Sequence, residues 1–295
     1  MYHQQRWTLE KLKARLALIV PLAYMKKSPL PPFYYRELSG PREKPDLDPD
    51  ISGWKEIPPN SYWGNWETNF QLITTFKIPD DWDSDLPIAL YIPLGIAGDF
   101  SHPEALVYID GDPIAACDRH HQEILLHPDW FDHHNHSLHL HGWTGLGEIV
   151  SSDPTRKLHM GEAQLVQIHS ETREFCALAR VTLATIENLA DDHPSKNRLL
   201  NAINAAFIRL ETNHPLADPF YASVLSAAKI LKAGIQHAGV AMDVIIHATG
   251  HAHLDVAWLW TLGQTRRKAE RTFHNVIRYM EQFPQYHFSQ SQPQL

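Results

Sequence analysis

The chain has 295 residues, 43% hydrophobic and 10% aromatic, enough apolar material for one large packed domain or several smaller ones and too much for a disordered chain. Its formal net charge is −8 and it has no long Lys or Arg run, which argues against nucleic acid or an anionic membrane surface as a partner. Cys117 and Cys176 form no CxxC pair, so no disulfide framework or thiolate metal site is indicated, and the expected location is the reducing cytoplasm.

Residues 1–53 are predicted to form an N-terminal helix and a wrapping loop. The apolar run Leu16 to Met25 superficially resembles a signal-peptide core, but Pro21 interrupts it and no small-residue cleavage site follows. No segment is long enough to span a bilayer. From Ser28 to Pro59 the chain is rich in proline and charge, which predicts an extended loop around a domain. Helical spacing before that loop predicts an amphipathic helix through Leu9, Leu12, Leu16 and Ile19.

Residues 54–152 are predicted to form a β-sandwich. Short strand-like runs at 70–78, 86–92 and 105–109 are separated by Pro, Asp and Gly. Asp110-Gly111 is a typical two-residue hairpin turn.

Histidines are dense in this segment, which raises the question of a second metal site. No fixed pairing with Cys or carboxylate accompanies them, and His139 and His141 alternate with leucines as on a half-solvated strand. The pattern favours a wet strand face and turn over a structural metal site. The residues are His120, His121, His127, His133, His134, His136, His139 and His141.

Residues 153–240 are predicted to be α-helical. Apolar positions between Glu162 and Ala190 mostly suit helices. Ser195 is a candidate N-cap for a second helix over 196–210, and a third helix is expected over 218–237.

Residues 241–295 carry the most informative motif. The apolar run Val244 to Thr249 predicts a buried strand, and Gly250 to Trp260 follows at its end. If the backbone stays extended, the side chains at 251, 253 and 255 point to one side, so two imidazoles and a carboxylate converge. These atoms suit a zinc-like ion. The alternative is that they only hydrogen-bond one another or cap the next helix.

A helix and a second strand are expected after the motif. Thr261 and Gln264 fit a capping box, and Pro284 ends an apolar helical stripe that is expected to be core. Tyr286 to Phe288 then begins a strand, so the order β-α-β predicts a parallel pair and the start of a β/α barrel. The stripe consists of Ala269, Phe273, Val276, Met280 and Phe283.

Three stretches together resemble the opening of the catalytic domain of glycoside hydrolase family 38 α-mannosidases: 250–260, 266–273 and 288–295. The resemblance implies that His253 and Asp255 are zinc ligands, that Trp258 lines the sugar site, and that His251 is not a ligand. More loosely, the predicted β-sandwich at 54–152 resembles galactose-binding-type jelly rolls. This resemblance rests on Trp63, Trp66, the hairpin 107–111 and the stretch 118–124.

The function that this resemblance implies is zinc-dependent, retaining hydrolysis of α-linked mannose in oligosaccharides. The zinc of the family enzyme holds sugar hydroxyls and favours an oxocarbenium-like transition state. The family's nucleophile and remaining zinc ligands come later in its sequence, so no catalytic residue is assigned here. A β/α barrel needs roughly 250 residues, whereas 52 residues of this sequence follow Asp243.

The expectation is therefore an incomplete, inactive or split N-terminal portion that holds zinc weakly. Its partners would be a mannose-containing oligosaccharide and a separately encoded remainder of the barrel. The alternative is a noncatalytic carbohydrate-binding or assembly module formed by residues 1 to about 240.

Overall fold

The computed structural model describes residues 2–95, 102–147, 158–239 and 244–292. It divides into two compact units. The helical unit comprises Met1–Lys27, Asp85–Pro87 and Val166–Ile246, and the sandwich unit comprises Ser28–Ser84, Ile88–Leu165 and His247–Leu295. The domain boundaries predicted near 152 and 240 lie outside the described residues, as do Asp243 and the end of the family motif at 293–295.

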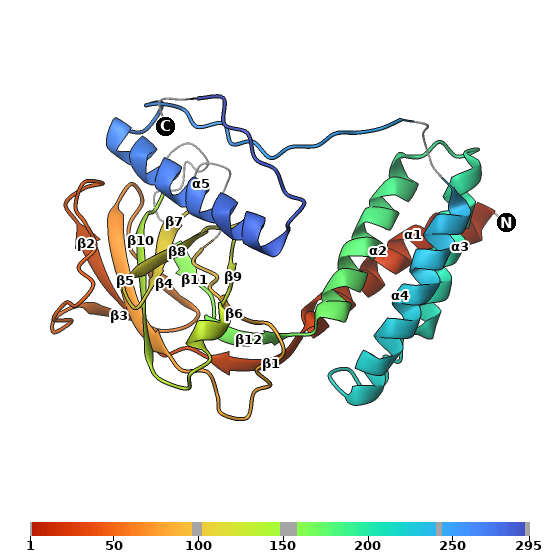
Figure 1. Cartoon of the computed structure of the whole chain (residues 1–295), viewed down its shortest axis with the longest axis horizontal. Helices are drawn as coiled ribbons and strands as arrows, with labels where there is room; N and C mark the ends of the chain where they lie inside the picture. The colour runs from red at the N-terminus through yellow and green to blue at the C-terminus, as the bar shows by residue number, and fades with distance from the viewer. Residues whose placement is uncertain (1, 96–101, 148–157, 240–243, 293–295) are drawn as a thin grey trace. The chain divides into compact units, whose positions relative to one another are not determined.

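In the helical unit, four helices pack around one apolar core (Figure 1). Leu12, Leu16 and Ile19 are buried in this core, which confirms the amphipathic N-terminal helix. The predicted third helix is also confirmed. The helices are α1 (Tyr2–Ile19), α2 (Ser170–Asn188), α3 (Pro194–Arg209) and α4 (Asp218–Ala238), with a short 3-10 turn η1 (Val20–Ala23) after α1.

Two boundaries in this unit differ from the prediction. Strand β12 (Gln164–Ile168) forms where the first helix was expected to begin, because its apolar run serves a sheet before the chain turns helical at Ser170. The cap of α3 is His193 and not Ser195, since His193 Nδ1 accepts a hydrogen bond from Ser195 N over 3.2 Å. An imidazole is outside the usual set of capping residues, so composition favoured the serine.

The sandwich unit contains strands from three sheets. The larger sheet has the order β3-β2-β5-β10-β7-β8, a second has β1-β12-β6-β9, and a small one pairs β11 with β4. The strands are β1 (Tyr24–Pro29), β2 (Phe33–Leu38), β3 (Lys55–Ile57), β4 (Ser61–Trp63), β5 (Asn69–Phe76), β6 (Ile88–Tyr91), β7 (Glu104–Ile109), β8 (Asp112–Cys117), β9 (Glu123–Leu125), β10 (His136–Trp143) and β11 (Leu158–Met160), with a 3-10 turn η2 (Pro128–Trp130) before β10.

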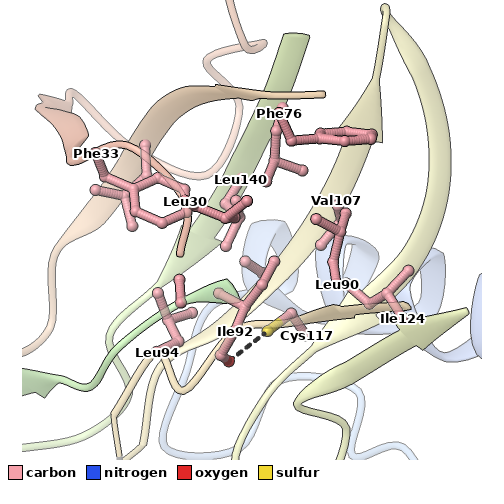
Figure 2. Close-up of a cluster of buried hydrophobic side chains, with 14 of the residues drawn as sticks. Leu30, Phe33, Phe76, Leu90, Ile92, Leu94, Val107, Cys117, Ile124 and Leu140 are labelled. Atoms are coloured by element: carbon pink, nitrogen blue, oxygen red, sulfur yellow. Dashed lines mark hydrogen bonds between the residues drawn. The ribbon is translucent and has the colours of Figure 1, made fainter. Parts of the chain in front are cut away.

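The two larger sheets share one hydrophobic core. Val107 and Leu140 from the larger sheet and Leu90 and Ile124 from the second contribute to the same buried cluster (Figure 2). Cys117 lies within this core, with its Sγ 3.5 Å from the Ile92 carbonyl oxygen, and burial raises the pKa of its thiol. Both Cys117 and Cys176 are buried free thiols.

The predicted hairpin is confirmed. β7 and β8 pair antiparallel, and Asp110 and Gly111 have φ of 51° and 94°, the left-handed conformation that a tight primed turn needs. The expected wrapping loop at 28–59 is wrong in part, because β2 pairs with β5 inside the larger sheet and β3 pairs with β2. The high proline content of this stretch predicted a loop, although two short strands lie between the proline-containing turns.

The predicted wet face of β10 is wrong. His139 and His141 are buried, like the leucines that alternate with them. Burial lowers the pKa of His141 to about 4, with Arg267 and Arg271 adding to the effect. Both arginines belong to helix α5 (Leu262–Gln282), which lies across β7 and β8 in Figure 1 and contacts both strands. The β7–β8 end of the sheet is therefore covered by a helix from the far end of the sequence.

These elements form mixed sheets with helices, as expected in outline, while the jelly-roll subtype and the β/α barrel stay predictions. Among the described residues, no helix combines the length and apolar character needed to cross a membrane.

Candidate metal and sugar site

Helix α5 is fixed to the sandwich by a buried charge cluster. Glu104 on β7 makes ion pairs with Lys268 and with Arg271, whose Nη2 lies 2.9 Å from Glu104 Oε2. Burial alone raises the pKa of Glu104, but Arg271 and Lys268 outweigh it and hold that pKa below its ordinary value. The carboxylate therefore stays charged beneath the helix.

Hydrogen bonds to main-chain atoms fix the rest of the same helix face. Ala116 N donates to Asn275 Oδ1 over 2.8 Å, Arg278 Nη2 donates to Leu125 O over 2.8 Å, and Arg267 Nε donates to Pro41 O over 2.8 Å. Only part of the predicted apolar stripe is core, because Met280 and Phe283 are exposed. The helix docks mainly through polar and charged side chains.

The motif segment begins differently from the prediction. Val244, Ile245 and Ile246 form no strand and are exposed, Ile245 to 87%. Periodicity identifies apolar residues but not the elements that would bury them, and no described strand pairs with this run.

A parallel bridge joins Gly250 to Phe288. Gly250 N donates to His287 O over 2.7 Å, and Ser289 N donates to Gly250 O over 2.8 Å. The parallel pairing predicted between the segments before and after α5 is therefore present, but only as a single bridge. A Cβ at position 250 would lie 2.2 Å from Tyr286 Oη, so any larger residue here would have to displace the Tyr286 ring.

The structure brings together two of the three side chains expected to converge. His253 Nε2 lies 3.2 Å from Asp255 Oδ1, and these side chains are 75% and 45% exposed. His251 Nδ1 instead donates to the carbonyl oxygen of Ser289 over 2.7 Å. None of the three caps α5, because Thr261 Oγ1 accepts from Gln264 N over 3.3 Å.

The His253 and Asp255 pair supplies one nitrogen and one oxygen donor. Catalytic zinc usually has at least three protein ligands. Across the described part of the chain, no group of three or more His, Cys, Asp or Glu side chains gathers in one place. The pair therefore fits part of a zinc site and not a complete one.

The backbone around the pair is held from two directions. Gln292 makes two hydrogen bonds to the main chain of Leu254. Its Nε2 donates to Leu254 O over 2.8 Å, and its Oε1 accepts from Leu254 N over 3.2 Å. The hydroxyl of Thr265, buried on α5, donates to Asp255 O over 3.2 Å and accepts from Ala257 N over 3.1 Å. Ala257 has a φ of 57°, which is strained for a residue with a Cβ, and its N–H is held by this bond.

Trp258 follows the strained residue and is 47% exposed. Its ring meets Trp260 edge to face, with centroids 5.2 Å apart and planes at 84°. Trp260 Nε1 also donates to Thr265 Oγ1, over 3.2 Å. The chain thus places Trp258 three residues after Asp255, with its ring against that of Trp260.

Sequence reasoning missed Thr265, Lys268 and Glu104 in this arrangement. Thr265 belongs to no recognisable motif, and Lys268 is a residue type that usually lies on the solvated face of a helix. Glu104 lies 164 residues from Lys268, too far for any local pattern to connect them.

Comparison with known proteins confirms the family resemblance. Residues 243–295 match the family described as glycosyl hydrolases family 38 N-terminal domain. α-Mannosidase 2C1 of Mus musculus is 27% identical over 207 residues, covering 66% of this chain and 19% of the mouse protein. α-Mannosidase G of Dictyostelium discoideum is 22% identical over 246 residues, covering 79% of this chain and 21% of its own length. The α-mannosidase of Saccharomyces cerevisiae is 35% identical over 79 residues, 27% of this chain and 7% of the yeast protein.

The segment that carries His253, Asp255 and Trp258 thus matches the N-terminal domain of glycosyl hydrolases family 38. Similarity to α-mannosidases extends well before that segment, into the sandwich and helical units. The chain spans about a fifth of the length of the mouse and Dictyostelium relatives.

Proposed function

We propose that this chain is part of a zinc-dependent, retaining α-mannosidase of the cytoplasm, acting on mannose-containing oligosaccharides. Within it, His253 and Asp255 supply two zinc ligands and Trp258 lines the sugar site. The observation that carries the proposal is the His253 and Asp255 contact of 3.2 Å on a segment matched to family 38.

The further zinc ligands and the catalytic carboxylates come, in this proposal, from residues outside 1–295. Retaining hydrolysis needs two carboxyl groups flanking the scissile bond, and Asp255 is used by the metal. The proposed organisation is a helical unit of α1, α2, α3 and α4, a sandwich of the jelly-roll type that includes β2 and β3, and barrel elements at 241–295.

Zinc titration of the purified chain tests the ligand assignment. His253→Ala and Asp255→Ala should each abolish the tightest zinc-binding event seen by calorimetry, because one remaining ligand cannot hold the ion. His251→Ala is the matched control, since its ring bonds to Ser289 O and should leave that event in place.

Two results would contradict this proposal. If the His253 and Asp255 variants bound zinc like the unaltered chain, the pair would be only hydrogen-bonded partners. If the 295-residue chain hydrolysed an aryl α-mannoside with zinc-dependent turnover, the catalytic carboxylates would lie within it.

A further inference from the structure

We infer that Glu104, a residue of the β-sandwich, is a positioning residue for the sugar-site tryptophan, acting through Lys268 and Trp260 on Trp258. This inference rests on the proposed function for the role of Trp258 in sugar binding. The contacts themselves stand independently of it, and all lie within the sandwich unit.

The first link joins the sandwich to α5. Glu104 and Lys268 form an ion pair in which both side chains are largely buried. Arg271 approaches the same carboxylate, so one negative charge lies between two cations. Without that carboxylate, two neighbouring buried cations would repel, and Lys268 would leave its position.

The second link is between the Lys268 ammonium and two indole rings. Its Nζ lies 4.4 Å from the ring centroid of Trp260 and 5.4 Å from that of Trp143. A cation over an indole face is attracted by the ring's negative potential, more strongly where water is excluded. The position of Lys268 therefore fixes the ring of Trp260 against the sandwich.

The third link carries this constraint to Trp258. Trp260 is held on one side by Lys268 and through its Nε1 by Thr265, and it presents its ring to Trp258 in an edge-to-face contact. Since Trp258 is about half exposed, this neighbour limits the orientations open to its ring. The charge of Glu104, on a strand distant in sequence, thereby sets the orientation of the Trp258 ring in the proposed sugar site.

Fluorine NMR of the chain labelled with 5-fluorotryptophan tests the inference, with the Trp258 resonance assigned through Trp258→Phe. Glu104→Gln keeps the side-chain shape and removes the charge, and it should move the Trp258 resonance towards that of a solvent-exposed indole. Glu104→Asp should restore it in part. Asn275→Ala is the matched control, because it loosens the same interface through Ala116 without touching Lys268.

If Glu104→Gln does not fold, Lys268→Gln gives the second test, since it removes the cation from the Trp260 ring and leaves Glu104 paired with Arg271. It should move the Trp258 resonance in the same direction. An unmoved Trp258 resonance in the folded variant, or an equal displacement in Asn275→Ala, would overturn the inference.

Titration with methyl α-D-mannoside in the presence of zinc separates the two proposals. The unaltered chain should show a sugar-dependent shift of the Trp258 resonance, and Glu104→Gln should reduce that response. If the unaltered chain shows no response while Glu104→Gln still displaces the resonance, the sugar site fails and the positioning network stands.

Discussion

His136 is buried between two carboxylates at the start of β10. Its Nδ1 lies 2.6 Å from Asp110 Oδ2, and its Nε2 lies 2.9 Å from Asp132 Oδ1. Burial lowers the pKa of His136, but the hydrogen bonds and charges of Asp110 and Asp132 outweigh it and leave this pKa above its ordinary value. The His136 ring thus ties the β7–β8 hairpin to the turn before β10 through Asp110 and Asp132.

The first prediction concerns the pH dependence of this contact. A raised folded-state pKa stabilises the fold fully below the unfolded pKa of about 6.5, and this stabilisation is lost as pH rises through the folded pKa. His136→Gln should therefore cost about 2 kcal/mol of unfolding free energy at low pH and progressively less above about pH 6.5. Urea unfolding at several pH values measures it.

The control for His136 is His134→Gln, at an exposed position on the same turn. It should change the unfolding free energy little at any pH. A cost of His136→Gln that stayed constant with pH would show that the ring stabilises by packing alone.

At the scale of elements, Gly142 marks a close approach between β10 and its neighbours. A Cβ there would lie 2.5 Å from Glu104 O and 2.5 Å from Phe70 Cζ. Gly142→Ala should lower the unfolding free energy by roughly 1–3 kcal/mol, because the pairing strands must separate to admit a methyl group. Chemical denaturation provides the measurement, with Gly40→Ala, where nothing lies within 4 Å, as the control.

Equal stability of the Gly142→Ala and Gly40→Ala proteins would show that β10 can shift freely, contrary to its buried environment on both faces.

The elements predicted correctly from the sequence are those that depend on residues close together in the chain. The spacing of Leu12 and Leu16 predicted α1, and Asp110-Gly111 predicted the hairpin. The motif also predicted that His253 and Asp255 lie together.

The features that sequence could not predict depend on distant partners. His139 and His141 alternate as on a wet strand, but groups distant in sequence lie against them: Gln71 and Asp46 beside His139, and Arg267 of α5 beside His141. Lys268 and Arg271 have the composition of a solvated face until Glu104 pairs with them. The apolar run that begins at Val244 was predicted to be a buried strand, but it is exposed. Hydrophobic residues alone do not determine which element will pack against them.

At the scale of the whole molecule, the two units have separate hydrophobic cores. We predict that they unfold in separable transitions. All tryptophans except Trp7 lie in the sandwich unit, so tryptophan fluorescence follows that unit, while far-ultraviolet circular dichroism weighs the helical unit more heavily.

Matched glycine variants test this separation. A Cβ on Gly234 would lie 2.3 Å from Ala202 Cβ, where α4 meets α3, so Gly234→Ala should lower the transition seen by circular dichroism and leave the fluorescence transition unmoved. Gly142→Ala should do the opposite. Joint movement of both transitions in either variant would show a single cooperative unit.

The ion pair between Glu104 and Lys268 also has a consequence for how the chain is made. Because 164 residues separate its two ends, the β-sandwich leaves the ribosome well before the helix that covers it. During that interval Glu104 lacks both of its cationic partners, Lys268 and Arg271, so the nascent sheet carries an unpaired carboxylate on β7. A charged side chain on an uncovered sheet disfavours pairing with other chains until α5 is synthesised.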